Sequence, residues 1–525
     1  MQIRKILGYM IALLLLHAGL ALSEEQQFGA ISFPNSGASE AQSAFLTGVK
    51  ALHSFDWDPA RIAFEKAQEI DPSFALAYWG QAMSDNHPLW AEQDMEAATA
   101  ALNKLAPDFQ SRLRKAPTEK EKAYLTAVET LYFSPGDKLQ RDFAYAEYMA
   151  RMHERWPDDH EISIFYALSL LGTVRRGDKG FRRQALAASI SQDIFAKNKN
   201  HPGAAHFIIH SFDDPDHAIL ALPAAKVYAD IAPAAGHALH MPSHIFVQLG
   251  MWQGVVNSNI EGYNVLVAVN KKYGLPEGHE EFHCLSWLIY GNLMLGHYDR
   301  ANENVGWALA AVERNPGDER VLGGYLRMRG RHMIETGQWQ DVALDEADSV
   351  EGSNAHWVSV VGMSAAHRGD IETATAAIDR LESLQKQAAA DAKNYDAIQI
   401  DILVKEVIAV SSLLSGDKQR AISMAREAAE MQMREMNAPS GPPWPMKPAI
   451  ELYGDVLLAA DRPADALVAY KRSIQWIPKR TPSILGLAKA AIAVGDNETA
   501  DEMFSKLKEM PGANPAINWH NTPPR

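Results

Sequence analysis

The stretch from Gly48 to Pro72 decides the fold, and it reads GVKALHSFDWDPARIAFEKAQEIDP. A glycine opens it, the pattern A-x3-F-x2-A follows at Ala60, and a proline closes it. Such small residues let two paired helices approach closely, and the aromatic side chain fills the gap to the next pair. The proline then ends one helix pair before the next begins. The stretch therefore predicts a unit of two packed helices.

The same unit returns near the other end of the chain, in GDVLLAADRPADALVAYKRSIQWIP from Gly454 to Pro478. Its small, aromatic and proline positions keep the spacings of the first stretch, and Ala488, Ala500 and Phe504 continue them. This is the pattern of the 34-residue tetratricopeptide helix-turn-helix repeat. No segment shows sustained period-two alternation, so no sheet is expected. We predict an all-α fold, a tetratricopeptide-type solenoid or superhelix.

Proline and glycine punctuation predicts how the chain is organised. Residues 436–448 hold too many prolines to be helical throughout, so we expect them to form a linker. The linker would separate a main solenoid at 41–435 from a carboxyl-terminal repeat pair at 449–510. We expect residues 24–40 and the tail at 511–525 to be loosely ordered.

The first 23 residues predict export. Arg4 and Lys5 precede an apolar run, and Ala21-Leu22-Ser23 offers small residues for cleavage before Glu24. The run is short for a membrane anchor, and no later segment is long and apolar enough to span a membrane. We expect a mature protein that is periplasmic or secreted and not inserted in a membrane.

The composition argues against nucleic-acid binding and excludes an internal disulfide. The chain is acidic, with a formal net charge of −15, and it has no stripe of basic residues. Nucleic acid is therefore not an expected partner. Cys284 is the only cysteine, so packing rather than an internal disulfide must hold the fold.

Histidines are concentrated in the middle of the chain. Three strings carry them: HPGAAHFIIHSFDDPDHA from His201, HALHMPSHIF from His237 and HEEFHCLSW from His279. Each string falls in the first helix of a successive pair, and in such solenoids the first helices line the concave groove. The nine histidines are His201, His206, His210, His217, His237, His240, His244, His279 and His283.

Helical spacing brings several of these rings to one face. Residues four apart, such as His206 and His210, lie one above the other on a helix. His237, His240 and His244 share a face if their segment is one helix. Pro242 either kinks that helix or begins a new one, and the sequence leaves both open.

Imidazoles with nearby carboxylates are typical ligands of divalent transition metals, zinc or copper before iron. Each histidine taken alone is also compatible with an ordinary core or groove residue, and Asp214 before Pro215 is also typical of a helix N-cap. HEEFH matches the H-E-x-x-H zinc motif, although a histidine pair sharing the groove is the preferred interpretation. The predicted ligands are His206, His210, His237, His240, His244, His283, Asp213 and Asp214.

Long strings of the chain resemble a widespread bacterial family of exported tetratricopeptide-repeat proteins. They are ALAYWGQAMSDNHPLWAEQD, KAPTEKEKAYLTAVETLY, HPGAAHFIIHSFDDPDHA and HALHMPSHIFVQLGMW, within about residues 40 to 310. The resemblance implies the fold and export, and it implies no particular reaction. The first string contains Trp79, His87 and Trp90, which we expect either in the core or, with His217 and His279, lining the groove.

Two functions follow from this pattern. The groove could bind a protein, a peptide or a small molecule, as such solenoids do, or it could be the active site of a metal-dependent enzyme. A groove rich in His and Asp is unusual for peptide capture, yet no complete catalytic motif of high specificity is present. A purely structural subunit would not require the histidines.

Overall fold

The computed structural model describes residues 27–175, 178, 180–350 and 354–520. The predicted signal peptide at 1–23 lies outside these residues. Most of the described chain is helical, and the only sheet found in it is an antiparallel pair of two-residue strands, β1 (Asn86–His87) and β2 (Glu92–Gln93). The all-α prediction is confirmed. Within the same residues, no helix is long and apolar enough to cross a membrane.

The chain divides into two compact units. The first unit comprises Met1–Ser169, Ser191–Ala204 and Asp230–Ala235, and the second comprises Leu170–Ile190, Ala205–Ala229 and Gly236–Arg525. In chain order the helices are η2 (Ser39–Ala41), α2 (Gln42–His53), α3 (Trp57–Ile70), α4 (Ala75–Met83), η3 (Pro88–Trp90), α5 (Met95–Leu105), α6 (Phe109–Lys115), α7 (Glu119–Phe133), α8 (Lys138–Arg155), α9 (His160–Gly172), α10 (Arg182–Lys197), α11 (Pro202–Ser211), α12 (Ala218–Ile231), α13 (Gly236–His240), α14 (Pro242–Leu249), α15 (Trp252–Tyr273), α16 (Glu280–Met294), α17 (Tyr298–Arg314), α18 (Glu319–Thr336), η4 (Leu344–Ala347), α19 (Asn354–Arg368), α20 (Ile371–Ala390), α21 (Asn394–Leu414), α22 (Lys418–Glu435), α23 (Ala449–Ala459), α24 (Pro463–Trp476), α25 (Thr481–Val494) and α26 (Asn497–Lys508).

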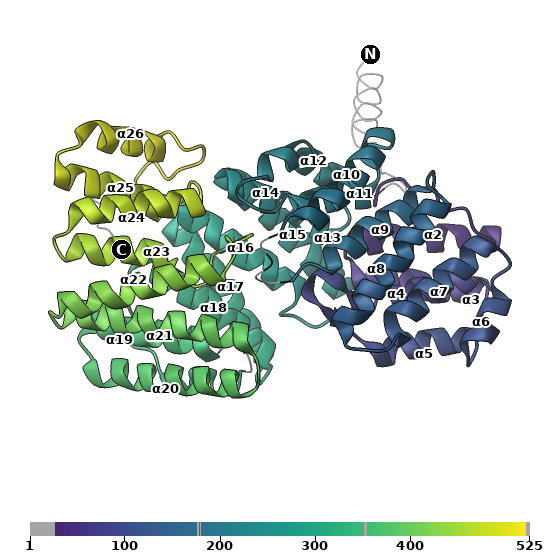
Figure 1. Ribbon diagram of the computed structural model, residues 1–525, viewed down its shortest axis with the longest axis horizontal. Coiled ribbons are helices and arrows are strands. Elements are labelled where there is room, and N and C mark those ends of the chain that lie inside the picture. The colour runs from purple at the N-terminus through teal and green to yellow at the C-terminus, as the bar shows by residue number, and fades with distance from the viewer. Residues whose placement is uncertain (1–26, 176–177, 179, 351–353, 521–525) are drawn as a thin grey trace, which may run out of the picture. The chain divides into compact units, whose positions relative to one another are not determined.

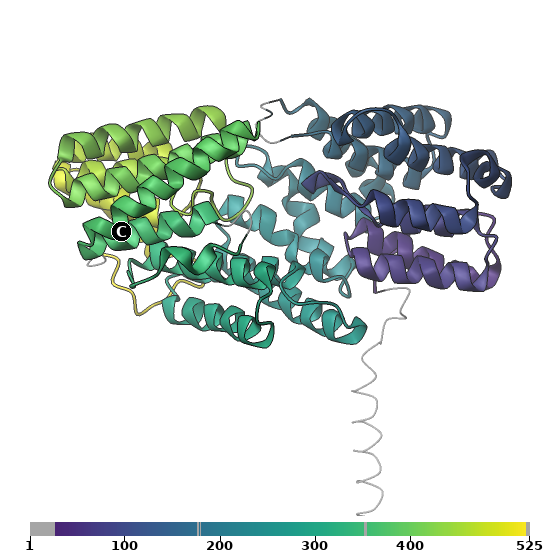
Figure 2. The same cartoon turned by 90° about the horizontal axis from the view of Figure 1, so that it is seen from below.

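Helices stack in sequence order in the second unit. From α19 to α26 each helix packs on the next, and α19, α21, α23 and α25 also contact one another in turn. Figures 1 and 2 show these helices as successive rows, from teal-green to yellow. Contacts to the next helix and to the next but one are what a solenoid of helix pairs requires. The predicted superhelix of paired helices is therefore present.

The aromatic positions of the repeat pattern explain this stacking. Phe64 on α3 lies between Gly48 on α2 and Gly80 on α4, where an added Cβ would come within 2.8 Å and 2.3 Å of its ring. Tyr470 on α24 lies between Gly454 and Gly486 at the same two separations. Phe64 and Tyr470 are both fully buried. Glycine is thus required on both sides of the ring that joins one helix pair to the next.

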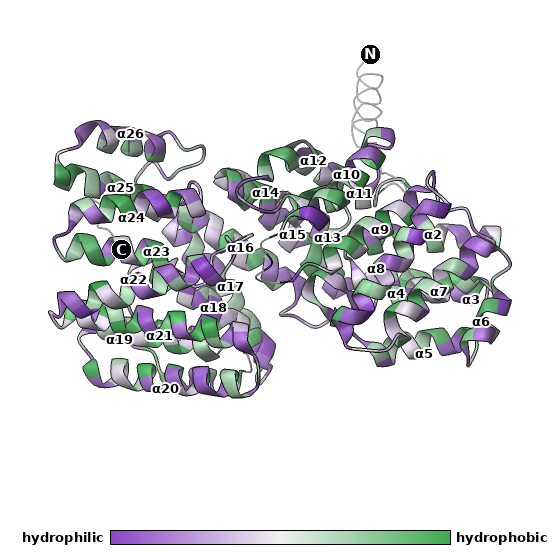
Figure 3. Cartoon of the chain, in the orientation of Figure 1, coloured by the Kyte–Doolittle hydropathy of each residue, from purple (hydrophilic) through white to green (hydrophobic). Residues whose placement is uncertain are grey.

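Figure 3 shows hydrophilic and hydrophobic residues on the same helices, as in α20 and α21. Such helices bury one stripe and leave the other to solvent. On α20 the buried stripe is Ala374, Ala377, Leu381 and Ala388.

Segments expected to be loosely ordered are packed where the structure describes them. Phe33, in the amino-terminal segment, is buried against Phe45 and Tyr124. In the tail, Trp519 is 5% exposed. A single large aromatic side chain can anchor an irregular segment, because its burial removes a large apolar area from water.

The proline-rich segment 436–448 also differs from the expected linker, because it lies inside the second unit and packs there. The backbone carbonyl of Pro439 accepts a hydrogen bond from Gln248, and that of Pro443 accepts one from Arg331. Gln432 donates to the carbonyl of Trp444. Prolines cannot donate backbone hydrogen bonds, but their carbonyls can be fixed by side chains in this way.

Candidate metal centre

Four helices of the second unit carry the six histidines predicted as metal ligands. The structure brings all six together in two groups of three. They are His206 and His210 on α11, His237 and His240 on α13, His244 on α14, and His283 on α16.

Pro242 answers the question that the sequence left open. Helix α13 ends at His240 and α14 begins at Pro242. Met241 between them stays in the right-handed helical region, with φ −55° and ψ −34°. The missing N–H of proline therefore interrupts the hydrogen bonding without reversing the chain. His237, His240 and His244 remain close to one another, with neighbouring ring centroids 5.8 and 5.0 Å apart.

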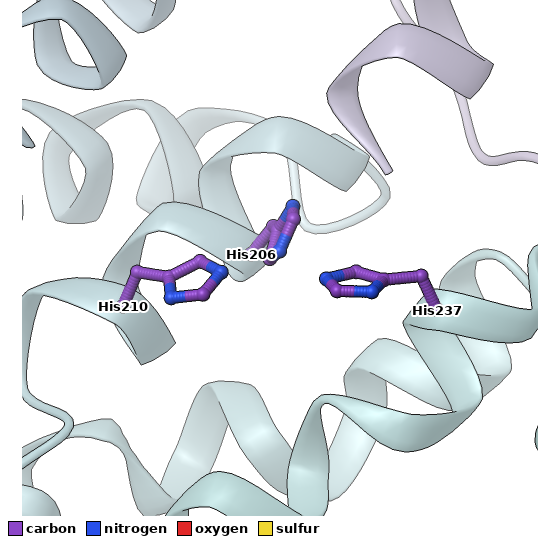
Figure 4. A group of neighbouring side chains, drawn as sticks. All are labelled: His206, His210 and His237. Carbon is purple, nitrogen blue, oxygen red and sulfur yellow. The ribbon is translucent and has the colours of Figure 1, made fainter. Parts of the chain in front are cut away.

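The first triad consists of His206, His210 and His237. Its ring centroids lie 4.7 Å apart for His206 and His210, 5.2 Å for His206 and His237, and 6.4 Å for His210 and His237. One ring nitrogen from each lies within 4.8 Å of the others. Figure 4 shows the two rings of α11 facing the ring of His237 across a common space.

The second triad consists of His240, His244 and His283. The Nε2 atom of His240 lies 3.0 Å from Nε2 of His244 and 3.0 Å from Nε2 of His283. A tetrahedral zinc ion with Zn–N bonds of about 2.0–2.1 Å would hold its nitrogens roughly 3.3 Å apart. Two of the three nitrogen pairs already lie at nearly this separation, and one ring nitrogen of each histidine lies within 4.8 Å of the others.

In two of the three histidines of the second triad, the other ring nitrogen is held by a neighbouring side chain. Nδ1 of His240 lies 2.6 Å from Oδ1 of Asn259, whose amide nitrogen donates to the carbonyl of Val255. Nδ1 of His244 lies 2.6 Å from the Asp213 carboxylate. Because both partner oxygens are acceptors, each Nδ1 carries the proton and each Nε2 presents a lone pair. Metal-ligating histidines are oriented by the same kind of partner.

Burial favours the neutral form of three of the six histidine rings, those of His210, His240 and His283. It lowers the pKa of His240 and of His210 well below the usual range, and the neighbouring histidines lower both further. Burial also lowers the pKa of His283, to about 4. For Asp213, burial raises the pKa, while the charge of His244 and its hydrogen bond lower it in part. Neutral imidazole is the form that coordinates a metal.

The two triads are adjacent. Ring centroids of His210 and His244 are 5.7 Å apart, and those of His237 and His240 are 5.8 Å apart, which is no longer than some separations within a triad. The Glu280 carboxylate lies 3.5 Å from Nδ1 of His237. The six imidazoles and this carboxylate form one donor cluster.

Asp214 lies apart from the cluster, unlike the ligand role predicted for it. Its carboxylate accepts from the backbone N–H groups of Asp216 and His217, and it holds Nδ1 of His217 at 2.8 Å. The His217 ring stacks on Phe181 at 3.8 Å. A short side chain that bonds the backbone two and three residues ahead closes a turn, so Asp214 has a local structural role.

The HEEFH string does not form a zincin site. His279 precedes α16 and contacts Arg320, whereas only His283 reaches a triad. Glu281 accepts from the backbone N–H of His279 and from the Asn270 amide, so it fixes the start of the helix. Only one histidine of the string therefore belongs to a triad, although both line the same cleft.

Trp79, His87 and Trp90 belong to the first unit. Trp79 is fully buried and packs on Phe165, so its place is in the core and not in a groove. His87 stacks on Trp57, and Trp90 is 42% exposed. The indole of Trp79 is too large an apolar surface to leave in water when a core lies next to it.

A third buried group lies in the first unit. The Glu161 carboxylate lies 2.7 Å from Nε2 of His53 and 3.1 Å from Nε2 of His201. Nδ1 of His201 accepts from the backbone N–H of Ala204, so its Nε2 must be the donor to Glu161. Both nitrogens of His201 are thus occupied, and the group is a structural clamp rather than a metal site.

Three residues around the histidines were not expected from sequence. Asn259 and Trp287 come from α15 and α16, and the Trp287 ring lies 4.5 Å from that of His244. Glu161 lies on α9, outside the three histidine-rich strings. Nothing local in the sequence marks an asparagine or a tryptophan as the partner of a distant histidine.

No family model matches the chain, and no curated protein matches it. Among solved structures, the chain is similar to yeast Tom70 at 10% identity, with a TM-score of 0.29 over 90% of this chain and 85% of that one. For a human IFIT1 dimer the identity is 10% and the TM-score 0.30, over 93% and 92%. A signal-transduction ATPase with a tetratricopeptide repeat sensor from Pyrococcus horikoshii gives 12% and 0.31, over 91% and 88%. At these scores the likeness carries no argument, and the fold rests on the helix packing described above.

Proposed function

We propose that this protein is an exported helical-repeat protein that holds divalent transition metal, copper or zinc, in the six-histidine cluster of its second unit. One ion would lie at His240, His244 and His283, and a second at His206, His210 and His237.

One observation carries the proposal. The Nε2 atoms of His240 and His244 approach to 3.0 Å while both Nδ1 protons are committed to Asn259 and Asp213. Two lone pairs at that distance repel each other, and a cation between them converts the repulsion into two bonds. A proton is a poor substitute, because burial lowers the pKa of His240 well below its usual range.

The donor set selects the kind of metal. Imidazole nitrogen suits zinc and copper, whereas magnesium and calcium prefer oxygen ligands. For equal donors Cu²⁺ binds more tightly than Zn²⁺, so copper should displace zinc from the protein.

The test is metal analysis of the untagged mature chain. We expect about one ion in each triad of the wild-type protein. The His240→Ala/His244→Ala variant should lose the second-triad ion and keep an unchanged helical circular dichroism spectrum. His217→Asn is the matched control, because His217 pairs with Asp214 outside both triads and should keep the full metal content. A wild-type protein free of transition metal after incubation with Cu²⁺ and Zn²⁺ would refute the proposal.

A metal-dependent enzyme is the second candidate, favoured by one feature. His283 lines a cleft of about 340 Å³, so one edge of the second triad is open to a small molecule. Three protein ligands and an open position are typical of catalytic rather than structural zinc sites.

A further inference from the structure

The cleft beside the second triad has two helical walls and a proline-rich rim. Helix α16 presents Phe282, His283, Ser286 and Trp287, which repeat at the spacing of one helix face. Helix α18 presents the second wall from Gly324 to Arg331, also at that spacing. The Pro442–Pro443–Trp444 run, Met446, His356 and the Gly278–His279 turn before α16 form the rest of the lining.

Close packing on either side fixes the walls. A Cβ at Gly324 would come within 2.5 Å of the Phe282 ring, and one at Gly441 within 2.3 Å of the Trp287 ring. Glycine therefore lets α18 approach α16, and it lets the proline-rich segment press against the tryptophan that covers His244.

The charged groups that line the cleft are all basic. No Asp or Glu is among its described lining residues, whereas Arg327, Arg331 and three histidines are. His356 is neutral, because burial and then the charges of Arg327 and Arg331 lower its pKa to about 3. The two guanidinium groups thus supply the positive charge of the cleft.

Arg331 and Arg327 differ in their partners. Arg331 donates to the carbonyl of Pro443 and lies 3.8 Å from the Glu335 carboxylate. Its positive charge is therefore paired with a carboxylate of the protein itself. For Arg327 no hydrogen bond and no ion pair occurs within residues 27–175, 178, 180–350 and 354–520, and its side chain is exposed to solvent at the cleft. A guanidinium group is well matched to a carboxylate, which it can bind through two parallel hydrogen bonds.

The rest of the lining is apolar and aromatic. Trp287, Met328 and Met446 are each at least 95% buried, and Trp444 is fixed by a hydrogen bond from its indole to His356. Pockets of a few hundred Å³ with an apolar lining and few polar groups are typical small-molecule sites.

We infer that this cleft binds a small organic carboxylate, with its carboxylate on Arg327, its apolar body between Trp287 and Trp444, and its far end toward His283. The inference deepens the proposed function, since it names the ligand class of the metal-bearing cleft. It rests on that function only for the role of the ligand at the metal, because Arg327 lies outside both triads.

Calorimetric titration of the full mature chain tests the inference, with benzoate, phenylacetate and N-acetylphenylalanine as acids and benzyl alcohol as their uncharged counterpart. At least one acid should bind, and benzyl alcohol should bind about tenfold or more weakly. Arg327→Met should weaken the acid by about tenfold to a hundredfold, and Arg327→Lys by less. Arg300→Met is the matched control, because Arg300 is exposed on α17 and does not line the cleft.

Metal content measured on the same samples separates this inference from the proposed function. Arg327→Met should keep its metal and lose the acid, while His240→Ala/His244→Ala should lose the second-triad ion and still bind the acid. If no acid binds more tightly than about 10 mM, or if Arg327→Met binds as well as wild type, the inference is overturned whatever the metal content. Preference for N-acetylphenylalanine over benzoate would assign the carboxylate to the end of a peptide.

Discussion

At the scale of single residues, the proposed metal binding should depend on groups that orient the histidines from outside the two triads. Asp213 holds Nδ1 of His244 at 2.6 Å, so Asp213→Asn should leave the ligands in place and weaken metal binding by about tenfold to a hundredfold. Chelator competition would measure this. Asp214→Asn changes the neighbouring carboxylate, which bonds His217 instead, and should bind metal like wild type. If both variants lost metal affinity equally, the hydrogen bond between Asp213 and His244 would not explain the loss.

In the first unit, substitution of Glu161 tests the stability of the fold rather than metal binding. Burial raises its pKa, but the charges and hydrogen bonds of His201 and His53 lower it more, to about 2. A folded-state pKa below the unfolded value stabilises the protein above about pH 4.5, and this contribution is lost as the pH falls toward 2. Glu161→Gln should therefore lower the free energy of unfolding by about 1–3 kcal/mol at pH 7. In urea titrations the difference from wild type should shrink at pH 3, and a constant difference would contradict the assignment.

At the scale of helices, the glycines beside the repeat aromatics set the packing. Gly80→Ala and Gly486→Ala would each place a Cβ 2.3 Å from the ring of Phe64 or Tyr470, so each should lower stability by about 1–3 kcal/mol. Gly306→Ala is the control, because Gly306 lies inside α17 with nothing within 4 Å of its added Cβ. That variant should gain up to about 1 kcal/mol from helix propensity alone. If thermal unfolding showed Gly80→Ala or Gly486→Ala to be as stable as Gly306→Ala, this account of the repeat would be refuted.

The same helices show what sequence can predict. The ring of Phe64 between two glycines, and the pairing of His206 with His210, follow from spacing along one or two neighbouring helices. Trp79 could not be assigned in this way, because core and groove positions have the same helical period. Asn259, which orients His240, comes from another helix and has no local signature. Spacing therefore predicts which residues share a face, and tertiary packing decides what that face meets.

At the scale of the whole molecule, export is a prediction that concerns residues outside the described structure. The basic residues, the apolar run and Ala21-Leu22-Ser23 predict a mature chain that begins at or near Glu24. Amino-terminal sequencing of protein from the native host would test this, and retention of Met1 would refute it.

The division into two units gives the last prediction, because all six candidate ligands belong to the second unit. A ligand that binds only the folded state stabilises it by about 2.7 kcal/mol when present at a hundred times its dissociation constant. Hydrogen exchange followed by mass spectrometry should therefore slow in α11, α13, α14 and α16 when Cu²⁺ or Zn²⁺ is added. Helix α2 of the first unit carries His53, which shares the Glu161 carboxylate with His201. It should keep its exchange rates, because both ring nitrogens of His201 are already hydrogen-bonded. The His240→Ala/His244→Ala variant should lose the protection of α14 and α16 and keep that of α11, which carries His206 and His210 of the first triad. Protection that spread equally over both units, or that survived in α14 and α16 of the variant, would show that the metal binds elsewhere.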